Sequence, residues 1–124
     1  MKREQESART YSSPRRFVHV IQHMVDVTDS RRENHRVPKR LSLSIQPLTD
    51  DFGPDGEPFL AISSDLSKRG MGFISDDPMV HDFVRITILE RDVSVIAQIR
   101  HSTSIGTLYP LFLIGVEFLD EYLV

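Results

Sequence analysis

Apolar and polar positions alternate along most of the chain after residue 40. The stretch LSLSIQP, residues 41–47, places an apolar side chain at every second position, which is the period of a half-buried strand. Apolar runs then recur at short intervals as FLAIS (59–63), MGFIS (71–75), FVRITILE (83–90), VSVIAQIR (93–100) and LFLIGVEF (111–118). Residues that favour turns separate these runs. The pattern predicts about six short strands and no helix within residues 41–118.

The spacing of these strands limits the fold class. Short strands at regular intervals, with no room for crossover helices, are typical of an antiparallel barrel or sandwich. Residues 31–124 are too few to form two large sheets, so the pattern favours a small closed or split barrel. We therefore predict an all-β domain, a six-stranded antiparallel β-barrel, over residues 31–124.

The first thirty residues follow a different pattern. Residues 1–13 are polar and charged, and they are predicted to form a disordered tail. Ser13 and Pro14 suit the start of a helix, and apolar residues then recur at helical spacing, which predicts a helix within residues 14–30. The β-rich run at residues 17–20 leaves a strand as the alternative.

Composition excludes several classes of site. The chain has no cysteine among its 124 residues, which rules out disulfides, thiolate nucleophiles and zinc–thiolate centres. The N-terminal sequence lacks the apolar core of a secretory signal, and the longest apolar run, residues 108–116, is too short for a membrane-spanning helix. These features predict a cytoplasmic protein with no membrane span.

Charge is distributed unevenly along the chain. Residues 1–36 carry eight Lys and Arg against five Asp and Glu, a net charge of +3, whereas residues 37–124 carry seven against thirteen, a net charge of −6. The segment RRENHRVPKR, residues 31–40, holds six basic side chains when His35 is included. A basic segment before an acidic body favours one localised anionic ligand over the coating of a nucleic acid.

A second polar cluster follows the second apolar run, FLAIS. In an extended loop the side chains of Asp65 and Ser67 would project to the same side, offering a carboxylate acceptor and a small hydroxyl. Gly70 permits a close approach of the backbone as the next strand begins. An Asx-type turn explains the same spacing without any ligand, so the cluster alone leaves both interpretations open.

Taken together, Arg32-x-x-x-Arg36 and Asp65-x-Ser67-x-x-Gly70 resemble the paired signature of the PilZ domain family. The similarity continues through GMGFISDDPMVHDFVRITIL and IAQIRHSTSIGTLYPLFLIGVEFLD, and it covers about residues 31–120. The resemblance implies a PilZ-like split barrel. It also implies a bacterial receptor for cyclic di-GMP that is not an enzyme and uses no cofactor.

The resemblance assigns the ligand-binding residues as Arg31, Arg32, Arg36, Asp65, Ser67 and Gly70. An arginine fork matches guanine O6 and N7 or two phosphate oxygens, and a carboxylate accepts from the guanine N1–H and N2–H₂ groups. In the family, an arginine at the place of Arg31 accompanies binding of an intercalated cyclic di-GMP dimer, so one or two ligands per chain stay open. Arg36 and Arg40 have the same spacing, but Pro38 would stiffen that segment, which favours the first frame.

Binding is expected to order residues 29–36 over the loop at residues 65–70. The N-terminal helix would then reorient toward an unidentified protein partner or a second copy, forming a homodimer. Two other functions are considered: a PilZ-fold scaffold that binds no nucleotide, which would not need the arginines, and a nucleic-acid-binding barrel, which would need exposed aromatic residues.

Other polar groups predict no metal site. His19 and His23 are one helical turn apart but have no evident third ligand, and the acidic loop at residues 50–57 lacks the alternating aspartates of an EF-hand. Arg100, at the end of an apolar run, could reach the ligand from the barrel wall or form a salt bridge, and the sequence does not decide between these.

Overall fold

The computed structural model describes residues 36–106, 108 and 110–119, and this part of the chain forms seven strands and no helix. The strands are β1 (Val37–Pro38), β2 (Ser42–Leu48), β3 (Phe59–Leu66), β4 (Gly70–Ser75), β5 (Phe83–Ile88), β6 (Val93–Ser104) and β7 (Phe112–Phe118). The predicted tail, N-terminal helix, Arg31 and Arg32 lie outside the described residues.

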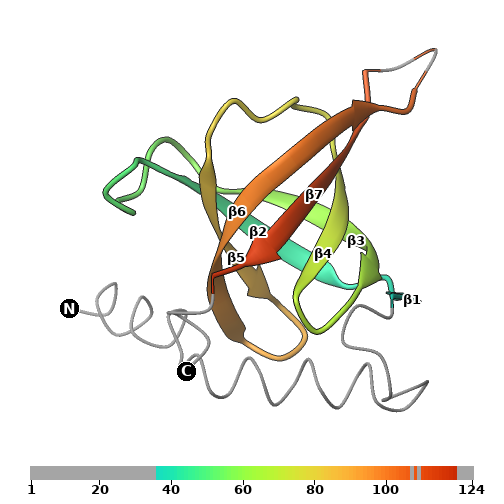
Figure 1. Cartoon of the computed structure of the whole chain (residues 1–124), viewed down its shortest axis with the longest axis horizontal. Coiled ribbons are helices and arrows are strands. Elements are labelled where there is room, and N and C mark those ends of the chain that lie inside the picture. The colour runs from blue at the N-terminus through green and yellow to red at the C-terminus, as the bar shows by residue number, and fades with distance from the viewer. Residues whose placement is uncertain (1–35, 107, 109, 120–124) are drawn as a thin grey trace.

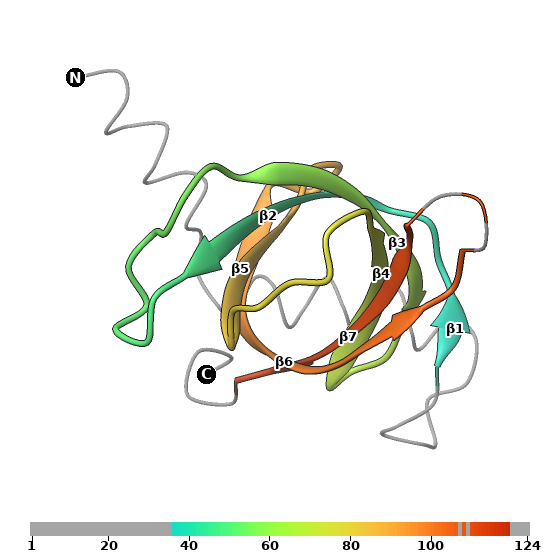
Figure 2. The same cartoon turned by 90° about the horizontal axis from the view of Figure 1, so that it is seen from above.

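The strands close into a barrel, as Figures 1 and 2 show. The sheet order is β1-β3-β2-β5-β6-β7-β4, and an additional pairing of β3 with β4 closes strands β2 to β7 into a barrel. All pairings are antiparallel. Strands β2 to β7 therefore form the six-stranded antiparallel barrel that the sequence predicts, and β1 is an additional short strand on β3.

Alternate residues of each strand fill the interior of the barrel. Leu43 and Ile45 on β2, and Ile86 and Ile88 on β5, are fully buried. Phe73 on β4 is the largest of the fully buried side chains. This arrangement follows from the two-residue period of a strand, which sends every second side chain to the same face.

Two strands are longer than the sequence predicts. The expected loop after Ser63 is wrong up to Leu66, because β3 continues and pairs with β4 through Asp65↔Gly72 and Leu66↔Met71. Strand β6 likewise extends beyond Arg100 to Ser104, in register with β7. Both extensions consist mainly of polar residues, so the apolar pattern does not reveal them.

The link between β1 and β2 is fixed by a buried serine. Ser63 is 1% exposed, and its hydroxyl donates to the Lys39 carbonyl oxygen at 2.5 Å and accepts from the Leu41 N–H at 2.8 Å. Val37 is also buried, which anchors β1 to the barrel. Pro38 is compatible with this position because β1 is an edge strand. Together these contacts position Arg36, the residue that precedes β1.

Within the part of the chain that the structure describes, there is no helix with the length and apolar character that a membrane crossing requires.

Candidate functional site

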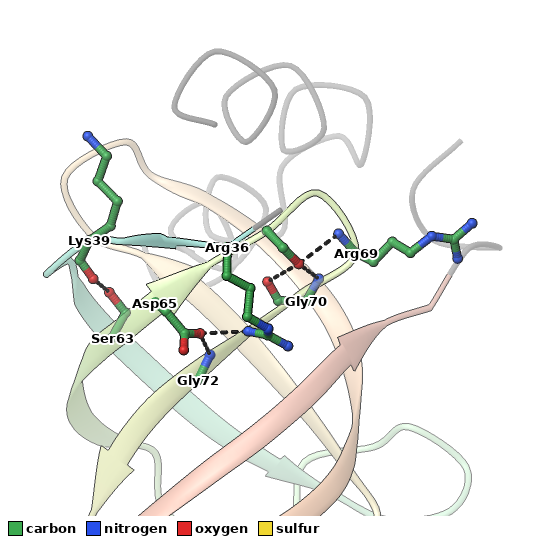
Figure 3. Close-up of polar contacts among 8 residues, drawn as sticks. Arg36, Lys39, Ser63, Asp65, Arg69, Gly70 and Gly72 are labelled. Atoms are coloured by element: carbon green, nitrogen blue, oxygen red, sulfur yellow. Dashed lines mark hydrogen bonds and ion pairs between the residues drawn. The ribbon is translucent and has the colours of Figure 1, made fainter. Parts of the chain in front are cut away.

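The pairing of β1 with β3 brings the two predicted motifs together. Val37 pairs with Leu66 and Pro38 with Asp65, which places Arg36 beside the end of β3. Arg36 Nη1 donates to Asp65 Oδ1 at 2.6 Å, as Figure 3 shows, and the two side chains are 48% and 35% exposed. A guanidinium and a carboxylate, 29 positions apart in the chain, therefore form one charge-assisted pair at the surface.

Asp65 is held from a second direction. The Gly72 N–H on the neighbouring strand β4 donates to the same carboxylate oxygen at 3.0 Å (Figure 3). The carboxylate thus links the residue before β1 to strand β4, and its position is defined by two donors before any ligand binds. Its other oxygen, Oδ2, takes part in neither of these two bonds.

Ser67 has a structural role in the turn between β3 and β4. Its side chain is 3% exposed, and its hydroxyl accepts from the N–H groups of Arg69 and Gly70 at 3.3 and 3.1 Å. The Ser67 N–H also donates to the Gly70 carbonyl oxygen at 2.9 Å. The turn interpretation that the sequence left open therefore describes Ser67 in this structure. Its hydroxyl is already engaged within the turn.

The absence of a side chain at Gly70 is explained by strand β7. A Cβ added to Gly70 would lie 2.1 Å from the Val116 carbonyl oxygen, which belongs to the backbone and cannot move aside easily. Gly70 pairs with Glu117 at this point. Close packing of β4 on β7 is thus sufficient to require glycine here, whatever the ligand.

Two small cavities adjoin the Arg36–Asp65 pair. One, of about 260 Å³, is lined by Arg36, Ser67, Arg69, Gly70, Arg100, His101, Gly115, Val116 and Glu117. The other, of about 160 Å³, is lined by Arg36, Asp65, Gly72, His101, Leu113 and Gly115. Arg36 and His101 belong to both linings. The larger cavity collects three arginines, which makes it suited to an anion.

Arg100 forms the salt bridge that the sequence left open, and it also lines the larger cavity. Its Nε donates to Glu117 Oε1 at 2.8 Å, and its Nη2 reaches the same oxygen. Glu117 is therefore a carboxylate within an otherwise cationic lining. It positions Arg100 and partly neutralises it.

Six ligand-binding residues were predicted from the two motifs and from Arg31, which precedes the first of them. Four of them, Arg36, Asp65, Ser67 and Gly70, are brought together around the cavities. Arg40, the alternative partner of Arg36, lines neither cavity. Arg31 and Arg32 lie outside the described residues.

His101 was missed as a site residue, as were Gly115 and Glu117. All three line the larger cavity. The signal for His101 would have been the continuation of β6 past Arg100, but its polar sequence, HSTS, is typical of a loop. Among the described residues, no group of three or more His, Asp or Glu side chains could hold a metal ion.

Comparisons with known proteins agree with this geometry. The profile of the PilZ domain family matches residues 30–122. A comparison with curated proteins gives no match. Among solved structures, the chain is similar to the Bacillus subtilis inhibitor of motility, MotI/DgrA, with a TM-score of 0.52 and 18% sequence identity.

That similarity covers 73% of this chain and 43% of the Bacillus protein, so the chain spans less than half of that protein's length and the likeness concerns the fold. The family profile covers about three quarters of the chain, on a closed six-stranded barrel that brings Arg36 beside Asp65. The chain belongs to the PilZ domain family, whose members are receptors and adaptors related to cyclic di-GMP.

Proposed function

We propose that this protein is a cytoplasmic receptor for cyclic di-GMP that passes the signal to a protein partner. The observation that carries the proposal is the Arg36–Asp65 pair at the edge of two cavities with three arginines in their lining. An arginine fork can bind guanine O6 and N7 or phosphate oxygens, and Asp65 Oδ2 can accept from guanine donors. None of these roles needs bond-breaking chemistry.

The size of the cavities supports a site that is completed by the N-terminal segment. Each cavity is smaller than the roughly 300 Å³ at which small-molecule sites usually begin. A ligand with two guanines and two phosphates would therefore extend beyond either one. In this proposal, Arg31 and Arg32 cover the exposed part of the ligand, and the presence of Arg31 favours an intercalated dimer over a single molecule.

Binding would then order residues 29–36 over the loop at residues 65–70 and change the orientation of the N-terminal segment toward its partner. Fixing each residue costs about 1–2 kcal/mol, and charge-assisted hydrogen bonds of roughly 1.5–3 kcal/mol each offset that cost. Lower amide hydrogen exchange at residues 14–36 in the complex would support this switch, and unchanged exchange at saturating ligand would exclude it.

A PilZ-fold scaffold that binds no nucleotide is the second candidate, and one observation favours it. Arg36 and Asp65 satisfy each other, Ser67 is engaged within its turn, and Gly70 is required by strand β7. Each described motif residue thus has an intramolecular role that needs no ligand. Binding measurements separate this scaffold from the receptor.

Calorimetric titration with cyclic di-GMP tests the proposal. The unsubstituted chain should bind one or two molecules saturably. Arg36→Ala should weaken binding by about a hundredfold, since two charge-assisted hydrogen bonds of roughly 1.5 kcal/mol each are lost. Arg40→Ala is the matched control, because it removes the same charge from the same segment, at a residue that lines neither cavity. No heat at high micromolar ligand would refute the receptor and leave the scaffold.

A further inference from the structure

Strands β3 and β6 each contain a register shift at the same level of the barrel. On β3 the shift lies between Ser63 and Asp65, and on β6 it lies between Ile99 and His101. An extra residue in a strand reverses the alternation of the side chains that follow it. Asp65 and His101 consequently face outward, whereas an unbroken alternation would have turned them toward the core.

The two shifted strands flank a pair of glycines. Asp65 pairs with Gly72, Gly72 pairs with Gly115, and Gly115 pairs with His101, so these four residues form one row across β3, β4, β7 and β6. The two central positions have no side chain. Neighbouring side chains take up the space over them: Ser64 Oγ and Asp65 Oδ1 lie 2.9 and 3.2 Å from where a Gly72 Cβ would be, and the His101 ring lies over Gly115. This glycine row is the floor of the smaller cavity.

The position of the His101 ring depends on Gly115. A Cβ added at Gly115 would lie 2.2 Å from Cε1, 2.5 Å from Nε2 and 2.9 Å from Nδ1 of the imidazole. The ring therefore occupies the space that a side chain would fill, and it lies against the backbone of β7. An aromatic ring covering a cross-strand glycine is a known way to stabilise a sheet, and this accounts for the packing.

The ring packed in this way also borders both cavities. His101 is exposed and lines both cavities, and it shares both linings with Arg36. A planar ring that is supported from below by glycine and open to a cavity is suited to stacking on a nucleobase, since every base has a π-face. Asp65, at the opposite end of the row, is the acceptor that would recognise the donor edge of the same base.

We propose that His101 is a ligand-contacting residue that stacks on a guanine base of the bound nucleotide, while Asp65 selects guanine by its N1–H and N2–H₂ donors. The inference rests on the proposed function, because it names the residue that holds the base at that same site. Because Gly72 and Gly115 have no side chains, the Asp65 carboxylate and the His101 ring can both lie close to the sheet and border the smaller cavity. Adenine, which presents an acceptor at N1, is disfavoured by the carboxylate.

Three variants measured with cyclic di-GMP separate stacking from other roles. His101→Ala should weaken binding about tenfold, the scale on which alanine removes a base–aromatic stack. His101→Phe keeps an aromatic face without ring nitrogens, and it should bind within about threefold of the unsubstituted chain. Thr103→Ala is the control on the same face of β6, two pairs further along at Leu113, and it should leave binding unchanged.

A fluorescence readout tests contact directly. The chain contains no tryptophan, so His101→Trp introduces a single indole at the proposed contact. Saturating cyclic di-GMP should quench its emission through stacking, and cyclic di-AMP at the same concentration should not, because Asp65 disfavours adenine.

The outcomes distinguish this inference from the proposed function. If the unsubstituted chain binds cyclic di-GMP but His101→Ala binds equally well, stacking by His101 is wrong and the receptor stands. If His101→Phe loses as much affinity as His101→Ala, the ring nitrogens matter and stacking is again wrong. If the unsubstituted chain does not bind, the receptor and this inference both fall.

Discussion

The β2–β5 side of the barrel is regular, whereas the side formed by β3, β4, β7 and β6 is not. Six consecutive residue pairs join β2 to β5 without a shift in register, and six more join β5 to β6. Both register shifts and the paired glycines Gly72 and Gly115 lie on the other side. Figure 2 shows the strands of that side, β3, β4, β7 and β6.

We infer from this difference that the regular side mainly stabilises the fold and the irregular side mainly binds the ligand. On the regular side, the alternation buries Ile45 and Ile86 completely, which contributes to the core. On the irregular side, the shifts and glycines turn Asp65 and His101 outward over a cavity. We expect substitutions on the regular side to change stability and substitutions on the irregular side to change ligand affinity.

The largest expected effect comes from a core truncation on the regular side. Ile86→Ala should lower the free energy of unfolding by about 3 kcal/mol, because truncating a fully buried isoleucine leaves a cavity. Urea denaturation measures this loss, and Ile62→Ala, at a position on β3 that is 52% exposed, is the matched control. At a temperature where the variant stays folded, its affinity for cyclic di-GMP should change less than about twofold, since Ile86 lines neither cavity. A larger loss of affinity in the folded variant would show that the two sides are coupled.

The next effect is a gain of affinity on the irregular side. Glu117→Gln removes the carboxylate from the larger cavity and releases Arg100 for a phosphate, so binding should tighten about fivefold at low salt and less at high salt. Titration calorimetry at two salt concentrations measures both changes. Stability should change by less than about 1 kcal/mol, as expected for an exposed ion pair.

Glu57→Gln removes the same charge from the loop between β2 and β3 and serves as the control. Weaker binding by Glu117→Gln would mean that positioning of Arg100 by Glu117 matters more for the ligand than the charge that Glu117 neutralises.

Much of the regular side could be predicted from sequence because its pattern is local. Alternation in LSLSIQP and FVRITILE indicates strands without any knowledge of their partners. The closeness of Arg36 and Asp65 was also predictable, but through a resemblance to a family and not through periodicity. The two-residue strand that positions Arg36 has no apolar pattern long enough to detect.

The irregular side could not be predicted in the same way. A register shift depends on how two strands pair, so the single extra residue on β6 is not visible in the local sequence. The contact of His101 with Gly115 likewise becomes apparent only when the register is known. Site residues supplied by bulges and by glycines on a neighbouring strand therefore escape motif analysis.

The smallest expected effect returns to the regular side, where Glu90 in the turn between β5 and β6 accepts from the Ser42 N–H through both carboxylate oxygens, at 3.1 and 2.9 Å. Partial burial would raise the pKa of Glu90, but hydrogen bonds from backbone N–H groups outweigh it and hold the pKa below its ordinary value. A lowered pKa in the folded state stabilises the fold above the pKa of the unfolded chain, and this contribution is lost as the pH falls through the folded-state value.

Glu90→Gln should thus lower the free energy of unfolding by about 0.5 kcal/mol at pH 7, a small value because the group is exposed. Urea denaturation of both proteins should show this difference shrinking as the pH falls below about 4, near the ordinary pKa of glutamate. A difference that stayed constant with pH would mean that the carboxylate charge does not stabilise this turn. An altered affinity for cyclic di-GMP would show that the regular side also affects ligand binding.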